Sequence, residues 1–145
     1  MNSPREYSAG RRFMGRLSPG SDLLQSLQSF CRQRGIAVAS FQLIGAVRSA
    51  RIAFYDQRHK KYGELAIDRA MEIVSCSGNI SLRDGQPFVH AHISLADEEG
   101  HSRGGHLLPG TIVFVAEVDV QELLGEALVR TPDQETGLPL WKIEP

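Results

Sequence analysis

The chain has 145 residues, 41% of them hydrophobic and 23% charged, and its 16 Lys and Arg nearly balance 17 Asp and Glu. This composition excludes disordered and fibrous proteins. The length predicts a single domain over 1–145, with a core at about 11–125 and a C-terminal segment, 126–145, packed against it. No apolar run reaches the ~20 residues that cross a bilayer, and the polar start of the chain does not resemble a signal peptide, so we expect a cytoplasmic protein without a membrane partner.

A short strand at 11–17 and then one amphipathic helix are predicted near the start of the chain. Asp22 suits the positive N-terminal end of this helix, and Gly35 closes it in the usual C-terminal manner. The apolar residues that recur at helical spacing and form one stripe are Leu23, Leu27, Phe30 and Cys31.

Beyond Gly35 the hydrophobic period falls to two, which predicts strands joined by tight turns. Residues 119–125 are expected to include a helical turn. One helix with many short strands favours an α+β fold, an antiparallel-rich mixed sheet with one main helix packed on it. The predicted strands are 37–46, 47–55, 62–67, 70–82, 87–96, 111–120, 126–131 and 138–143.

The strongest chemical signal is a pair of histidines, His90 and His92, on one predicted strand. Alternation with apolar Val89, Ala91 and Ile93 places both imidazoles on the polar face, with Cα atoms ~6.6 Å apart. A third histidine follows after thirteen residues, across a turn signal at Glu99-Gly100, so a hairpin return brings it beside the pair. The alternative is a set of exposed or hydrogen-bonded histidines on a polar strand face.

That third histidine, His106, follows Gly104-Gly105, which allow a close backbone approach or a positive φ. Three histidines with an open fourth position are typical of catalytic zinc sites, although other divalent transition metals also accept imidazole. We therefore expect Zn²⁺ or another such metal on His90, His92 and His106, bound less tightly below pH ~6.5. For a metal-activated water, Glu72 and Glu117 are the candidate catalytic bases.

Several motifs in one order resemble the PCC (plants and prokaryotes conserved) domain, over roughly Arg11 to Gly125. Stand-alone bacterial and archaeal proteins share this domain with plant AT-hook nuclear proteins. The motifs that carry the resemblance are Pro19–Leu24, Ile44–Val47, Glu72–Ile80, His90–Asp97, Gly104–Leu107 and Ala116–Val118.

The resemblance implies an α+β fold around an antiparallel sheet, and a homotrimer. In prokaryotic members it also implies a metal held by the histidines that correspond to His90, His92 and His106. Apolar strand residues beyond what one helix can cover agree with an oligomer. Those residues are Phe41, Leu43, Phe54 and Phe114.

Three functions remain open from the sequence. The first is a small metal-binding protein that binds a small-molecule ligand or performs metal-dependent chemistry. The second is a DNA-binding or regulatory protein, the description usual for the family. Two basic features favour DNA binding: the turn Arg58–Lys61, and a spot formed by Arg11, Arg12 and Arg16. The net charge of −1 and the lack of an AT-hook oppose it. The third is a structural trimer in which the metal only stabilises the fold.

Overall fold

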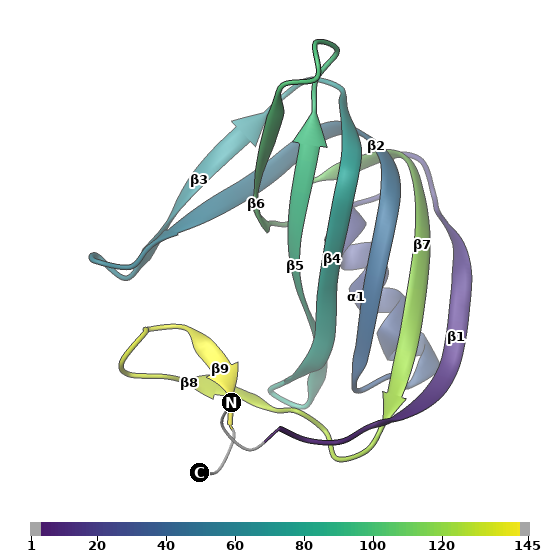
Figure 1. Ribbon diagram of the computed structural model, residues 1–145, viewed down its shortest axis with the longest axis vertical. Helices are drawn as coiled ribbons and strands as arrows, with labels where there is room; N and C mark the ends of the chain where they lie inside the picture. The colour runs from purple at the N-terminus through teal and green to yellow at the C-terminus, as the bar shows by residue number, and fades with distance from the viewer. Residues whose placement is uncertain (1–3, 143–145) are drawn as a thin grey trace.

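The structure, a computed structural model, describes residues 4–142. One seven-stranded sheet forms most of it (Figure 1). Its strands are β1 (Ser8–Leu17), β2 (Ala39–Asp56), β3 (Lys61–Ile67), β4 (Met71–Arg83), β5 (Gln86–Ala96), β6 (Ser102–Leu107) and β7 (Ile112–Leu124). They lie in the order β1-β7-β2-β4-β5-β6, with β3 attached to β2, and all pair antiparallel. The expected α+β class is confirmed.

The helix α1, Leu23–Arg34, covers one face of the sheet and lies behind it in Figure 1. Its N-terminus is capped by Asp22, whose Oδ1 accepts a hydrogen bond from the backbone N–H of Gln25 at 2.9 Å. Its C-terminus ends at Gly35, which has the left-handed φ of 66° that favours glycine. The buried stripe contains Leu23, Leu27 and Cys31, so the helix predicted from the sequence is confirmed.

Strand β2 belongs to two parts of the sheet. Its first half pairs with β7 and β4, whereas its second half pairs with β3 and, at Ile52 and Ala53, with β6. The two strands predicted at 37–46 and 47–55 are therefore one strand. The ladder continues past an irregularity next to Gly45, where φ is 141° and an added Cβ would lie 2.1 Å from the carbonyl oxygen of Val115.

Three other predictions from the sequence need correction. Residues 119–124 are extended in β7 rather than helical, because β1 pairs along β7 as far as Ser8 and Leu124. Strand β6 was not among the predicted strands. Phe41 and Leu43 are buried in the core, whereas Phe54 and Phe114 are exposed as expected.

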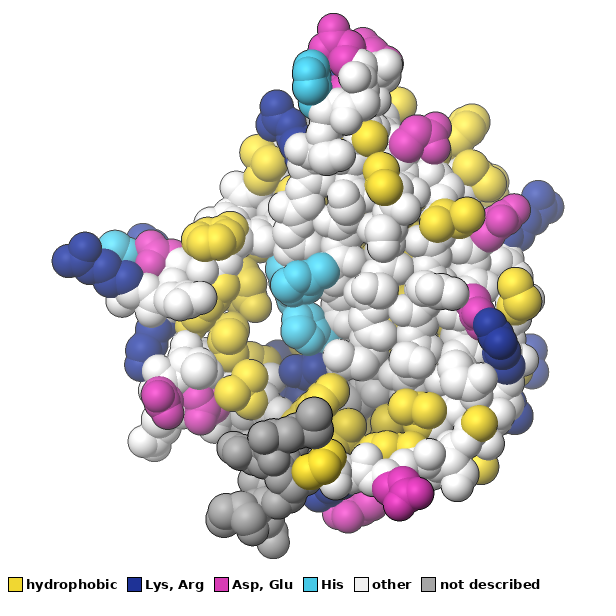
Figure 2. Space-filling view, viewed as in Figure 1, with side chains coloured by type: hydrophobic (Ala, Val, Ile, Leu, Met, Phe, Trp, Pro, Cys, Tyr) yellow, Lys and Arg dark blue, Asp and Glu magenta, His cyan; other side chains and the backbone are white. Residues whose placement is uncertain are grey.

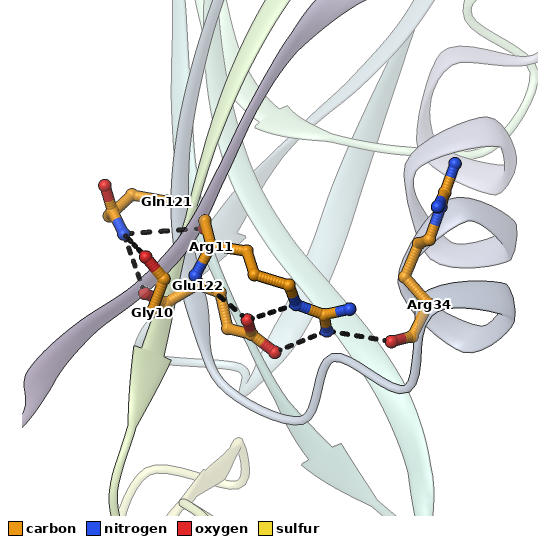
Figure 3. A network of polar contacts seen from close by, with 5 residues as sticks. All are labelled: Gly10, Arg11, Arg34, Gln121 and Glu122. Carbon is orange, nitrogen blue, oxygen red and sulfur yellow. Dashed lines mark hydrogen bonds and ion pairs between the residues drawn. The ribbon is translucent and has the colours of Figure 1, made fainter.

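A polar network fastens β1 to its neighbours (Figure 3). The Arg11 guanidinium donates to both carboxylate oxygens of Glu122 at 2.7 Å, and to the carbonyl oxygen of Arg34 at the end of α1 at 2.9 Å. The Glu122 carboxylate also accepts from the backbone N–H of Arg11. The ion pair of Arg11 and Glu122 thus connects β1 with β7 and, through the arginine, with the end of the helix.

The C-terminal segment folds back onto the sheet as a small hairpin of β8 (Arg130–Pro132) and β9 (Pro139–Trp141). Both are shorter than predicted, and residue 143 of the predicted strand 138–143 lies outside the described residues. The backbone N–H of Leu82 donates to the carbonyl oxygen of Leu128, and the Tyr55 hydroxyl donates to that of Thr136. Within 4–142, no helix is both long enough and apolar enough to cross a membrane.

Candidate metal centre

Three histidines converge from two neighbouring strands. His90 and His92 lie on the same face of β5, and His106 on β6 is the register partner of His92. The alternating residues of β5, among them Ala91, are buried in the core, so the imidazoles face away from the helix. One ring nitrogen from each histidine lies within 4.8 Å of the others. This spacing suits a single ion bound at ~2 Å from each nitrogen.

The ring arrangement is compact. The ring centroids are 5.0 Å apart for His90 and His106, 5.4 Å for His90 and His92, and 5.5 Å for His92 and His106. Tyr62 of β3 stacks on His106 with 5.1 Å between the centroids. This stacking restricts the orientation of the His106 ring.

The two glycines before His106 permit a close backbone approach. An added Cβ would lie 2.7 Å from the carbonyl oxygen of Ile93 at Gly104, and 2.7 Å from that of Ala53 at Gly105. Neither glycine has a positive φ. Of the two roles considered for this pair, close approach is the one the structure shows.

The histidines line an open hollow of about 790 Å³. Its walls come from β5 and β6, from the β2–β3 hairpin and from the segment between β8 and β9. In Figure 2 the cyan imidazoles lie at the edge of a depression beside this hairpin, and dark blue atoms are visible next to them. The other lining residues are Ala53, Phe54, Tyr55, Gln57, Tyr62, Gly105, Glu135, Thr136 and Leu138.

The surroundings favour neutral imidazoles. Burial lowers the pKa of His90 to about 4, with further lowering by the charge of Arg130 and by the neighbouring histidines. Burial also lowers the pKa of His106, as do His92 and Arg130. Since a metal binds the unprotonated ring, protons compete at these two rings only below the pH of ~6.5 expected for free histidine.

A buried nitrogen gives a separate test of whether these residues suit a metal. Nδ1 of His106 is inaccessible to solvent and has no hydrogen-bond partner among the described residues. Buried ring nitrogens are normally paired, because an unpaired one loses its hydration without compensation. A lone pair left for an ion accounts for this arrangement, so the donor set fits a divalent transition metal.

The buried Arg130 lies against the same cluster. Its Nη2 is 3.4 Å from Nδ1 of His90 and donates to Oδ1 of Asn79 at 2.9 Å. Its Nε donates to Oγ of Ser81 at 2.9 Å, and its Nη1 donates to the carbonyl oxygen of Pro139 at 3.0 Å. The arginine thereby fastens the C-terminal hairpin beside the histidines.

The candidate bases lie elsewhere. Glu72 lines a hollow with Ala46 and Phe114, and Glu117 lines another with Met14 and Ile44. Neither is among the residues that line the histidine hollow, so the geometry does not support a base role for either at this site.

The other two histidines lie apart from the cluster and are exposed, as expected. His59 pairs with Asp56 at the β2–β3 turn. His101 lies near Asp97 and Glu99 at the β5–β6 turn, where Asp97 is largely buried and the three side chains form a second group whose spacing could hold an ion.

Sequence reasoning missed two site residues, Tyr62 and Arg130. Tyr62 occupies an ordinary strand position, and no local pattern distinguishes it. For Arg130 the sequence gives only a weak indication, which is a single charged residue directly after the apolar pair Leu128-Val129. Its proximity to His90 comes from the return of the C-terminal hairpin, which no local spacing reveals.

The chain is similar to several known proteins. The sequence model of the Plants and Prokaryotes Conserved (PCC) domain matches residues 4–124. A metal-containing protein of Archaeoglobus fulgidus has 42% identity and a TM-score of 0.92, over 96% of this chain and 98% of its own. A plant- and prokaryote-conserved (PPC) protein of Pyrococcus horikoshii has 39% identity and a TM-score of 0.93, over 99% of both chains.

Two further relatives carry other descriptions. A Bacteroides thetaiotaomicron structure, described as a candidate DNA-binding protein, has 27% identity and a TM-score of 0.84, over 94% of this chain and 97% of its own. The bifunctional protein GlmU of a Synechococcus strain is 35% identical over 125 residues, which are 84% of this chain and 19% of that protein. The chain thus spans about a fifth of the curated relatives it matches.

Proposed function

Since the chain belongs to the Plants and Prokaryotes Conserved (PCC) domain family, we propose that it is a metal-binding member in which His90, His92 and His106 hold a divalent transition metal, with zinc the first candidate. The observation that carries this proposal is the convergence of three ring nitrogens within 4.8 Å on adjacent strands. The unpaired Nδ1 of His106 supports it, as does the metal-containing A. fulgidus relative.

The three histidines leave room for a further ligand, because they approach from the sheet side and the hollow opens on the other. A zinc ion with three histidine ligands supplies Lewis acidity to whatever occupies its open position. The protein's own contribution is to keep the rings of His90 and His106 unprotonated by burial and to orient His106 through Tyr62. The hollow is large enough for a small-molecule ligand.

The proposal is tested by metal analysis of protein purified without a histidine tag, followed by reconstitution with zinc. We expect about one metal per chain in the native protein and loss of tight binding in His92→Ala, because two imidazoles bind a divalent ion far more weakly than three. His59→Ala is the matched control, since that exposed histidine pairs with Asp56 and lies outside both groups that could hold an ion. Equal stoichiometry in native protein and His92→Ala, or no metal after reconstitution, contradicts the proposal.

DNA binding is the second candidate. The description of the B. thetaiotaomicron relative favours it, as does the position of the basic turn Arg58–Lys61 at the tip of a hairpin that projects from the sheet (Figure 1). The opposing observation is that Glu122 and Asp119 neutralise Arg11 and Arg12 of the second basic spot. We therefore rank DNA binding below metal binding.

We further propose a homotrimer, on the basis of family resemblance and an apolar surface on the sheet. Met14, Ile44 and Val74 lie on β1, β2 and β4 of the one sheet and are exposed on the face away from the helix, Met14 to 78%. A metal that only stabilises such a trimer is the third candidate. The cytoplasmic location predicted from composition stays a prediction.

A further inference from the structure

The positive charge of Arg130 is buried without a carboxylate partner among the described residues. The residue is 8% exposed, and the partners of its guanidinium are a hydroxyl, an amide oxygen, a backbone carbonyl and an imidazole. The ring faces of Phe88 and Trp141 lie 5.3 and 5.4 Å from its Cζ. Buried arginines are ordinarily paired with an anion, because burial of an uncompensated charge is costly.

Metal binding would concentrate positive charge further. Three neutral imidazoles add no negative charge to a divalent ion, and the Arg130 guanidinium lies 3.4 Å from one of them. Glu135, the carboxylate that lines the hollow, is exposed and forms no ion pair with Arg130 within 4–142. With only the His90 ring between them, the charges of the ion and the guanidinium repel in a half-buried site, so an anion at the open position would stabilise both.

The hollow indicates which kind of anion. Its volume of about 790 Å³ far exceeds that of an inorganic oxyanion, and Phe54, Tyr62 and Leu138 supply apolar walls. Apolar surface around a few convergent polar groups is typical of sites for small organic molecules.

We propose that this site binds a small organic carboxylate, whose negative charge is held at the metal ion and offsets the buried charge of Arg130 behind His90. The proposal rests on the metal site proposed above and adds the ligand class and the residue whose charge favours an anion there. Arg130 does not itself line the hollow, so it acts on the anion through its charge from behind His90, in addition to fastening the C-terminal hairpin.

The test uses cobalt-loaded protein, in which the visible absorption spectrum reports changes around the ion. Acetate and butyrate are titrated, with neutral acetamide and inorganic phosphate as comparisons. We expect a saturable spectral change with both carboxylates, tighter binding of butyrate because of the apolar walls, and no change with acetamide. Equal responses to acetate and acetamide overturn the proposal, and tighter binding of phosphate than of butyrate overturns the choice of an organic anion.

A bare metal ion also binds carboxylates, so the role of Arg130 needs its own variants. Arg130→Gln should keep the cobalt stoichiometry and weaken acetate binding at least about tenfold, with Arg130→Lys intermediate. Arg83→Gln is the matched control, because Arg83 contacts the same Phe88 ring but is half-exposed, and its loss should change acetate binding less than about twofold.

Unchanged acetate affinity in Arg130→Gln and Arg130→Lys overturns the assignment of this arginine. If Arg130→Gln fails to fold, Arg130→Lys still tests the role of the arginine, and the acetate–acetamide comparison on native protein still tests the ligand class. Cobalt bound at full stoichiometry without any acetate response contradicts the carboxylate proposal alone, whereas absence of cobalt binding contradicts the metal site itself.

Discussion

Gly78 on β4 is the register partner of Ala91 of β5, the residue between His90 and His92. An added Cβ would lie 2.1 Å from the carbonyl oxygen of His90 and 2.8 Å from Cε1 of Phe41. Both neighbours are constrained, one by the strand ladder and the other by the core. The spacing between β4 and β5, and with it the position of His90, depends on the missing side chain.

We expect Gly78→Ala to lower the free energy of unfolding by about 2 kcal/mol or more, because backbone must move to admit the methyl group. Gly15→Ala is the control, since an added Cβ there meets no atom within 4 Å. Urea denaturation of both variants checks this. A Gly78→Ala protein as stable as the control would show that β4 and β5 are not held this closely.

At the level of single residues, much of the candidate site could be predicted from the sequence. The alternation of Ala91 with His90 and His92 fixes their common face, and a short hairpin return reaches His106. Arg130 could not be predicted to lie nearby, because the contact joins residues 40 positions apart through a hairpin that is not adjacent in the sheet order.

Among the elements, β1 is an edge strand that pairs with β7 and is held further by the Glu122 carboxylate. Hydrogen bonds from the Arg11 side chain lower the pKa of Glu122 below its ordinary value, against an opposing effect of burial. A carboxylate whose pKa is lower in the folded state stabilises the fold above its unfolded pKa. That contribution is lost as the pH falls through the lower, folded value.

We expect Glu122→Gln to lose about 1–2 kcal/mol of unfolding free energy at pH 7, with the difference from native protein shrinking below pH ~4.5. Glu126→Gln, which removes a largely exposed partner of Arg5, should differ little from native protein at any pH. Urea denaturation between pH 7 and 3 measures both. A difference for Glu122→Gln that stays constant down to pH 3 would contradict this account.

Some secondary-structure elements are indicated by residues within their own segment of the sequence, whereas others depend on distant pairing partners. The helix is marked by Asp22, Gly35 and its apolar stripe, and the structure follows all three. The extended state of residues 119–124 arises from pairing with β1, more than 100 positions away, which overrides the local tendency to turn. The continuity of β2 likewise depends on partners on both sides.

For the whole molecule, the proposed homotrimer predicts a light-scattering mass of three times the 16.0 kDa chain at micromolar concentration. Ile44→Glu should shift this mass toward that of a single chain, because it places a charge in the exposed apolar surface of Met14, Ile44 and Val74. A mass near 16 kDa for native protein would contradict the trimer.

The net charge of the whole molecule predicts weak DNA binding. With a net charge of −1, the protein should bind random and AT-rich duplexes with similar Kd values, weaker than about 1 µM at physiological salt, and with a steep salt dependence. Fluorescence titration of both duplexes checks this. Sequence-selective nanomolar binding would place DNA binding above metal binding.

We have proposed that three histidines from β5 and β6 form one metal site. Anomalous diffraction from zinc-soaked crystals, recorded on both sides of the zinc absorption edge, tests it most directly. We predict a single strong peak about 2 Å from a ring nitrogen of each of His90, His92 and His106. No peak there, or the principal peak beside Asp97, Glu99 and His101, would contradict the account.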